Sequence, residues 1–137
     1  MLYRTTVDVD APAAAVWAIV RDVETWPSWT PTMSTVELQD SAFEPGATVR
    51  VSQPGRKPDV YTVLAVDDRR FLWAARKTGF RQWADHRVEG LGRDRCRVEL
   101  AFGIDGTLGP VVGPLSRRTV VRFVDTEAAA LKARAEG

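Results

Sequence analysis

The sequence has few of the residues from which catalytic and metal sites are usually built. Its 137 residues include one cysteine, Cys96, and one histidine, His86. A single cysteine cannot form an intramolecular disulfide, and one cysteine with one histidine falls short of the usual zinc ligands. The glycines of "GTLGPVVG" lack the strand, the helix and the Lys-Ser/Thr pair of a phosphate-binding loop. We therefore expect neither a metal nor a cofactor.

An excess of charge and long apolar runs are also lacking. The 19 Lys and Arg residues almost balance 18 Asp and Glu residues, so the net charge of +1 creates no overall field that would attract nucleic acid or an anionic membrane. No apolar stretch approaches the roughly 18 residues of a membrane span. The opening "MLYRTTVDVD" alternates in polarity, unlike a signal peptide. We expect a cytoplasmic protein that neither inserts into membranes nor binds nucleic acid.

What the sequence does contain is a patterned, 45% hydrophobic chain, which predicts one domain over residues 1–137. The polarity alternates along seven segments, which predicts strands, and recurs with helical spacing in two others. The predicted strands are 2–10, 34–40, 47–53, 60–67, 71–78, 80–89 and 93–105, and the predicted helices are 12–23 and a long one from 108 onward. Residues 26–31, "WPSWTP", form a tight connector that Pro27 and Pro31 keep from being a continuous helix.

This order of elements predicts an α+β fold. Short connections favour an antiparallel sheet of six or seven strands, and the long C-terminal helix is the main element available to cover its apolar face. Pro110 and Pro114, next to Gly109 and Gly113, predict weak or kinked first turns of that helix. A sheet that curls around a helix leaves a space between them, which the connector would close at one end.

The residues then resemble a known superfamily. "VDVDAPAAAVWAIVRDVETWPSWTPTMSTVEL" is similar to the opening of the SRPBCC (START-like, helix-grip) superfamily, in its polyketide cyclase/dehydrase-like branch. "FLW" at 71–73, "DHRVE" at 85–89 and "EAAALKARAE" at 127–136 resemble later blocks of that branch, so the likeness covers essentially the whole chain. It implies a helix-grip (START/Bet v 1-like) fold with an internal cavity. It does not decide function, because the superfamily includes ligand carriers, cyclases, hydroxylase domains and regulators.

Alternation within the strands predicts which side chains face the cavity. In the five predicted strands from 47–53 to 93–105, the residues expected to face inward are, in chain order, 49 and 51; 61, 63 and Ala65; 71, 73 and 75; 80, 82, 84, 86 and 88; and 96, 98, 100, 102 and 104. Asp85 is expected in solvent on the opposite face from His86. A three-residue loop at 90–92 would place Asp85 opposite Arg97, and Cys96 opposite His86.

An apolar pocket with a few placed polar groups is the usual composition of a small-molecule site. We predict that these residues contact the ligand: Trp26, Trp29, Val51, Tyr61, Trp73, Gln82, Ala84, His86, Val98, Leu100, Phe102, Val112, Leu115 and Phe123. Gln53 is a further polar candidate. The alternative is a filled core whose polar groups are hydrogen-bonded to one another or to water.

Catalytic candidates are few. His86 and Tyr61 are the inward groups that could move protons. Asp85 cannot orient His86, because neighbours in a strand point to opposite faces. Glu127, near the edge of the long helix's apolar face, is the best remote carboxylate for that role. Cys96 is a weaker candidate, as a nucleophile beside His86.

Three functions stay open. The first is a module that binds a small, mainly apolar and cyclic or aromatic molecule. The second is an enzyme similar to polyketide cyclases, aromatases or dehydratases, and the third is a regulator that acts through a protein partner. Trp26 and Trp29 either plug the core or line the cavity entrance, which the start of the long helix would gate from the facing side. Trp83 points outward, where it covers the sheet, pairs with a neighbour or marks a homodimer contact.

Overall fold

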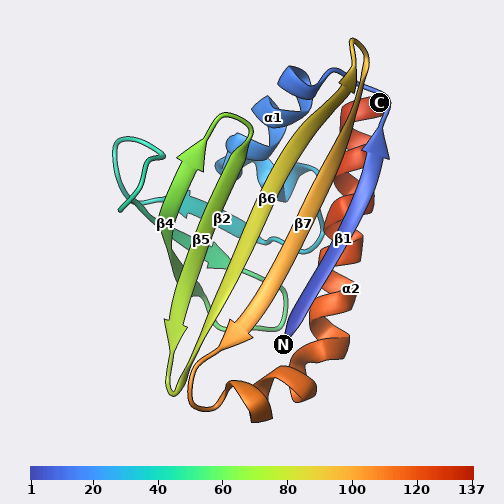
Figure 1. The fold of residues 1–137 in the computed structure, drawn as a ribbon. Helices are drawn as coiled ribbons and strands as arrows, with labels where there is room; N and C mark the ends of the chain where they lie inside the picture. Colours follow the sequence, from blue (N-terminus) through green and yellow to red (C-terminus); the bar gives the residue numbers. More distant parts are fainter.

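A single curved sheet and one long helix dominate the structure, a computed structural model that describes residues 1–137 (Figure 1). The strands are β1 (Leu2–Val9), β2 (Thr35–Leu38), β3 (Thr48–Ser52), β4 (Asp59–Asp67), β5 (Arg70–Lys77), β6 (Phe80–Gly92) and β7 (Arg95–Asp105). The helices are α1 (Ala13–Arg21), the 3-10 helix η1 (Val23–Ser28) and α2 (Gly109–Glu136). The sheet order is β1-β7-β6-β5-β4-β3-β2, and every pair is antiparallel. The predicted fold and all seven strands are confirmed.

The β6–β7 hairpin differs from the predicted pairing. β6 extends beyond its expected end to Gly92, whereas β7 begins at Arg95, two residues later than predicted. A two-residue turn joins the strands, with an irregularity in the pairing between Gly90 and Gly92. Arg97 therefore lies opposite Glu89 and not Asp85, and His86 lies opposite Leu100 and not Cys96. The prediction placed the turn too early, because the glycines were taken as loop. The register error is four residues, an even number, so the inward and outward faces stay as predicted.

A β-bulge in β4 corrects one inward assignment. Val63 pairs with Trp73, but the register shifts before Ala65, which pairs with Leu72. Val66 is then the residue opposite Phe71, and it packs against the core. The extra residue of a bulge reverses the alternation beyond it, so Ala65 shares the outer face with Leu72.

On the outer face, Asp85 is where alternation predicts, but it is not in solvent. It is 8% exposed and accepts hydrogen bonds from Arg70 and Arg87. Burial opposes ionisation of this carboxyl, yet the hydrogen bonds and positive charge of both arginines lower its pKa. The expectation of exposure was wrong because it ignored the long arginine side chains that cover the carboxylate.

The half-buried Trp83 also has a structural role on this face. It pairs across the sheet with Gly103, and a Cβ added to Gly103 would lie 2.2 Å from the indole ring. The indole therefore lies over Gly103, which has no side chain to displace it. Of the three roles considered for Trp83, it has the first, which is to cover the outer face of the sheet.

The α2 helix is continuous from Gly109 to Glu136, with Pro114 inside it, and its course changes direction after the first turns (Figure 1). This agrees with the predicted kink, because a proline inside a helix removes one backbone hydrogen bond and bends the axis. Pro110 lies in the first turn, where no intrahelical partner for its N–H is needed. The Leu108 N–H donates to the Gly79 carbonyl at 2.7 Å, and the Leu108 side chain lies against Gly79. The helix start is thus fixed to the β5–β6 turn. None of the helices is both long and apolar enough to cross a membrane.

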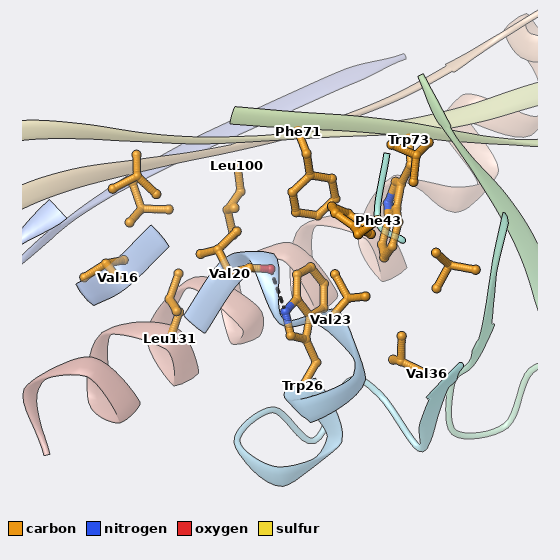
Figure 2. Packing of buried hydrophobic residues seen from close by; sticks show 14 of the residues in the cluster. Val16, Val20, Val23, Trp26, Val36, Phe43, Phe71, Trp73, Leu100 and Leu131 are labelled. Carbon is orange, nitrogen blue, oxygen red and sulfur yellow. Dashed lines mark hydrogen bonds between the residues drawn. The ribbon is translucent and has the colours of Figure 1, made fainter. Parts of the chain in front are cut away.

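The hydrophobic core lies where α1 and η1 close one end of the sheet (Figure 2). Trp26 is 1% exposed, and its indole N–H donates to the Val20 carbonyl at 3.0 Å. Its ring contacts Phe71 and Trp73 at centroid distances of 6.1 and 5.6 Å. A proline-restricted backbone and a hydrogen bond to α1 therefore fix a large aromatic ring at the closed end of the sheet.

Candidate functional site

The cavity lies between α2 and the concave face of the sheet. Because α2 packs mainly on β1 and β7, it leaves the inner face of β3 to β6 uncovered (Figure 1). At one end Leu108 contacts Gly79, and at the other Glu127 lies near His86. β6 and α2 therefore run in the same direction on opposite sides of the cavity. At about 3.3 Å per strand residue, the seven steps from 79 to 86 span roughly 23 Å.

The cavity has a volume of about 320 Å³, and 16 of its 25 lining residues are hydrophobic. The sheet and connector contribute Trp26, Thr32, Met33, Val51, Gln53, Arg56, Tyr61, Trp73, Lys77, Phe80, Gln82, Ala84, His86, Leu100, Ala101, Phe102 and Ile104. The helix contributes Val112, Leu115, Ser116, Thr119, Val120, Phe123, Val124 and Glu127. The volume and the mainly apolar walls are typical of a site for a small organic molecule.

The mouth of the cavity is marked by the lining residues that reach solvent. Only Arg56, Lys77 and Leu115 are exposed, and Leu115 is 80% exposed. They come from the β3–β4 loop, the end of β5 and the early part of α2. The mouth is therefore at the end of the molecule where α2 begins.

The inner end is formed by His86, Glu127 and an aromatic cluster. His86 is 4% exposed, and its ring stacks on Phe71 with centroids 4.1 Å apart and an interplanar angle of 13°. Trp26 lies 5.3 Å from the same ring, so this tryptophan is at the blind end of the cavity. The His86 Nε2 and the Glu127 Oε2 are 3.8 Å apart, too far for a hydrogen bond. The His86 Nδ1 is buried without a partner.

Burial shifts the two pKa values of this pair in opposite directions. Desolvation lowers the pKa of His86 to about 4 and raises that of Glu127 to about 8. Both side chains are therefore uncharged near neutral pH, and they do not form an ion pair despite their proximity. In this state the Glu127 carboxyl can donate a proton, while the His86 ring has one nitrogen free to accept a hydrogen bond.

A polar network occupies the middle of the wall. The Gln82 Nε2 donates to the Tyr61 hydroxyl at 2.8 Å and to the Asp59 carboxylate at 3.2 Å, and Lys77 forms an ion pair with Asp59. Burial, with the nearby Asp59 charge, raises the pKa of Tyr61, so its hydroxyl stays protonated at neutral pH. Trp73 stacks on Tyr61 at a centroid distance of 4.9 Å. These contacts hold the Gln82 amide and the Tyr61 ring in fixed orientations.

The structure brings the predicted site residues together in this cavity with two exceptions. Val98 is fully buried in the core and does not line the cavity. Trp29 packs on Trp26, at a centroid distance of 5.7 Å, behind the blind end. The predicted entrance at Trp26 and Trp29 is therefore wrong. The connector lies at the opposite end from the mouth. It plugs the core, which was the alternative interpretation of the two tryptophans.

Sequence reasoning also missed several lining residues. Thr32 and Met33 follow the connector with no periodic pattern, and Arg56 and Lys77 are charged residues that alternation cannot place at a rim. The Asp59 partner of Gln82 and Lys77 is buried at the start of β4, where the sequence predicted no inward position. No group of three or more potential metal ligands occurs in the structure.

A curved antiparallel sheet around a long helix, with a cavity between them, defines a START-like helix-grip domain. Solved structures agree at a level that establishes the fold. A START superfamily protein from Mycobacterium smegmatis has a TM-score of 0.83 and 22% identity, over 98% of this chain and 97% of that chain. The aromatase/cyclase ZhuI from Streptomyces sp. R1128 has a TM-score of 0.76 and 18% identity, over 99% and 93%. The di-domain aromatase/cyclase BexL has a TM-score of 0.79 and 22% identity, over 97% of this chain and 45% of that chain.

Residues 2–136 match the family described as polyketide cyclase / dehydrase and lipid transport, and the chain belongs to that family. A comparison with curated proteins gives no significant match. The family and the fold agree with the resemblance seen in the sequence, and a description that spans catalysis and transport leaves both kinds of role open.

Proposed function

We propose that the protein binds a small, mainly apolar molecule with a cyclic or aromatic portion in the cavity between α2 and the sheet. The observation that carries this proposal is the cavity itself, of about 320 Å³, with apolar walls and polar groups at few positions. Removing apolar ligand surface from water would supply most of the affinity. The rings of Trp26, Trp73 and Phe123 on the walls favour a flat, ring-containing ligand.

The polar groups would fix the ligand's orientation. At the inner end, His86 and Glu127 offer a hydrogen-bond acceptor and donor without net charge, which suits a hydroxyl or a carbonyl oxygen. A carboxylate there would be desolvated without a cation to balance it. The favoured ligand therefore places a neutral oxygen at the inner end and its apolar body along α2.

Filling the cavity tests the proposal. Ala84 lines the middle of the cavity, so Ala84→Phe should reduce the affinity for an apolar fluorescent probe at least tenfold. Ala129→Phe, at an exposed position of α2 outside the cavity, is the matched control and should bind the probe as the wild type does. Native mass spectrometry of the purified protein would look for a co-purifying ligand. If Ala84→Phe stays folded and binds the probe unchanged, the proposal is refuted.

A second function, catalysis in the same cavity, is favoured by the His86–Glu127 pair. A neutral base and a protonated acid whose pKa values are pushed apart form a usual arrangement for proton transfer at a carbonyl compound. His86 would remove a proton from carbon, and Glu127 would protonate the carbonyl oxygen as a carbon–carbon bond closes a ring. Tyr61, held by Gln82 and with a raised pKa, would position the substrate without giving up its proton.

The enzyme hypothesis has a direct test. A poly-β-ketone thioester should cyclise faster with wild-type protein than in buffer, as followed by the absorbance of an aromatic product. Glu127→Gln should remove this acceleration while probe binding is retained. No acceleration by the wild type would leave the protein as a binding module.

A further inference from the structure

The rim of the cavity mouth has an exposed apolar face that nothing in the fold covers. Leu108, Val111 and Leu115 are 45%, 60% and 80% exposed. Their spacing of three and four residues places them on one side of the first turns of α2. Leu115 also lines the cavity, so this face is continuous with the mouth. We call these three residues the rim face.

Positive charge surrounds the rim face. Arg56, Lys57, Arg76 and Arg118 are exposed and form no ion pair. Arg117 is not part of this group, because its guanidinium lies over the Tyr3 ring on the other side of α2. The four unpaired residues lie on the β3–β4 loop, the end of β5 and the first half of α2, all at the end of the molecule where α2 begins (Figure 1). The first sixteen residues of α2, 109–124, contain arginines but no acidic residue. Four of the eleven Lys and Arg residues that form no ion pair therefore lie near the cavity mouth, although the net charge of the chain is only +1.

The two nearby acidic groups do not cancel this charge. Asp59 is buried and paired with Lys77, and Asp105 is paired with Arg81. An apolar helix face flanked by unpaired arginines and lysines is the usual composition of a surface that adsorbs to anionic lipid.

We propose that the rim face docks on an anionic phospholipid surface, with the cavity mouth against the bilayer. The three apolar side chains enter the boundary between headgroups and acyl chains, and the surrounding cations contact lipid phosphates. A second copy of the chain is a poorer partner, because two like-charged rims would meet. The arrangement also lets an apolar molecule pass between the bilayer and the cavity without entering water, where exposure of its apolar surface is unfavourable.

The test is sedimentation with vesicles of phosphatidylcholine alone or with about a third phosphatidylglycerol, at low salt. Wild-type protein should bind the anionic vesicles much more tightly, and added salt should weaken binding. Arg118→Glu should weaken it at least fivefold, from roughly 1 kcal/mol per charge near the surface. Arg134→Glu makes the same charge change at an exposed, unpaired position at the far end of α2, and it should have less than a twofold effect.

A second pair of variants separates apolar docking from charge alone. Val111→Ser removes apolar surface from the rim face and should weaken vesicle binding about fivefold. Val60→Ser makes the same change on the outer face of β4, where Val60 is 46% exposed, and it should have no effect. Val111 does not line the cavity, so probe binding without vesicles should stay unchanged.

Three results would overturn the docking proposal. The first is no preference of the wild type for anionic vesicles, and the second is an equal loss of binding in Arg118→Glu and Arg134→Glu. The third is a dimer in light scattering that Val111→Ser dissociates, which would assign the rim face to a second copy. Because sedimentation measures binding to the vesicle and not occupancy of the cavity, these outcomes are independent of whether probe binding succeeds or fails.

Discussion

Replacing Glu127 by Gln should change how the stability of the protein depends on pH. The pKa of Glu127 is about 8 in the folded protein against an ordinary value of 4.5. The folded state therefore keeps a proton that the unfolded state loses between these values, and the wild type loses stability as pH rises through this range. Gln has nearly the same shape and does not titrate, so it removes only this contribution.

The magnitude follows from the two pKa values. Between pH 6 and pH 8 the difference in free energy of unfolding between Glu127→Gln and wild type should grow by about 2 kcal/mol in favour of the variant, at 1.36 kcal/mol per pK unit. His86 acts in the opposite sense. Its folded pKa is about 4, so its contribution is present above pH 6.5 and falls at lower pH. The histidine is present in both proteins, so the subtraction isolates Glu127.

The assay is urea unfolding followed by tryptophan fluorescence, at pH 6, 7 and 8, without ligand. Equal urea slopes for the two proteins would show that only stability has changed. A difference between the proteins that stays constant with pH would mean that Glu127 is ionised in the folded state near neutral pH. The proposed neutral pair with His86 would then be refuted, and with it the acid role of Glu127.

Other substitutions test the description of the fold. Trp26→Ala should lower the free energy of unfolding in urea by about 3 to 5 kcal/mol. Trp29 lies outside the cavity, so Trp29→Ala should change the affinity for the probe by less than twofold. A larger change would mean that Trp29 contacts the ligand. Gly103→Ala should cost about 1 to 3 kcal/mol through contact with the Trp83 ring, and a second change, Trp83→Ala, should make the two effects clearly non-additive. Asp85→Asn should destabilise the protein by about 1 to 2 kcal/mol at pH 7, a gap that closes as pH falls through the lowered pKa of Asp85; a gap unchanged in acid would contradict its ion pairs.

The sequence predicted side-chain directions correctly in strands that alternate between buried and exposed residues without interruption. Alternation along β6 placed Gln82, Ala84 and His86 inward, because each inward residue of a strand is two positions from the next. It failed at Ala65, where a bulge that has no sequence marker reverses the pattern. It also failed for the β6–β7 pairing, because glycines that continue a strand look the same as glycines that end one.

The site could be predicted as a set of residues but not as a geometry. The proximity of His86 and Glu127 depends on how α2 crosses the sheet, and no local pattern encodes that placement. Trp26 and Trp29 are close in sequence and both aromatic, yet only Trp26 reaches the cavity. The location of the mouth depends on which lining residues are exposed, a property of the folded surface as a whole.

The parallel course of β6 and α2 makes the cavity a ruler for ligand length. Each inward residue of β6 is about 6.6 Å beyond the last, and about four helix residues cover the same distance. Phe80, Gln82, Ala84 and His86 are successive marks from mouth to floor, and a bulky side chain at one mark would set the longest molecule admitted. Related chains that differ in residue size at these positions should therefore sort their ligands by length, in steps of about five carbon–carbon bonds.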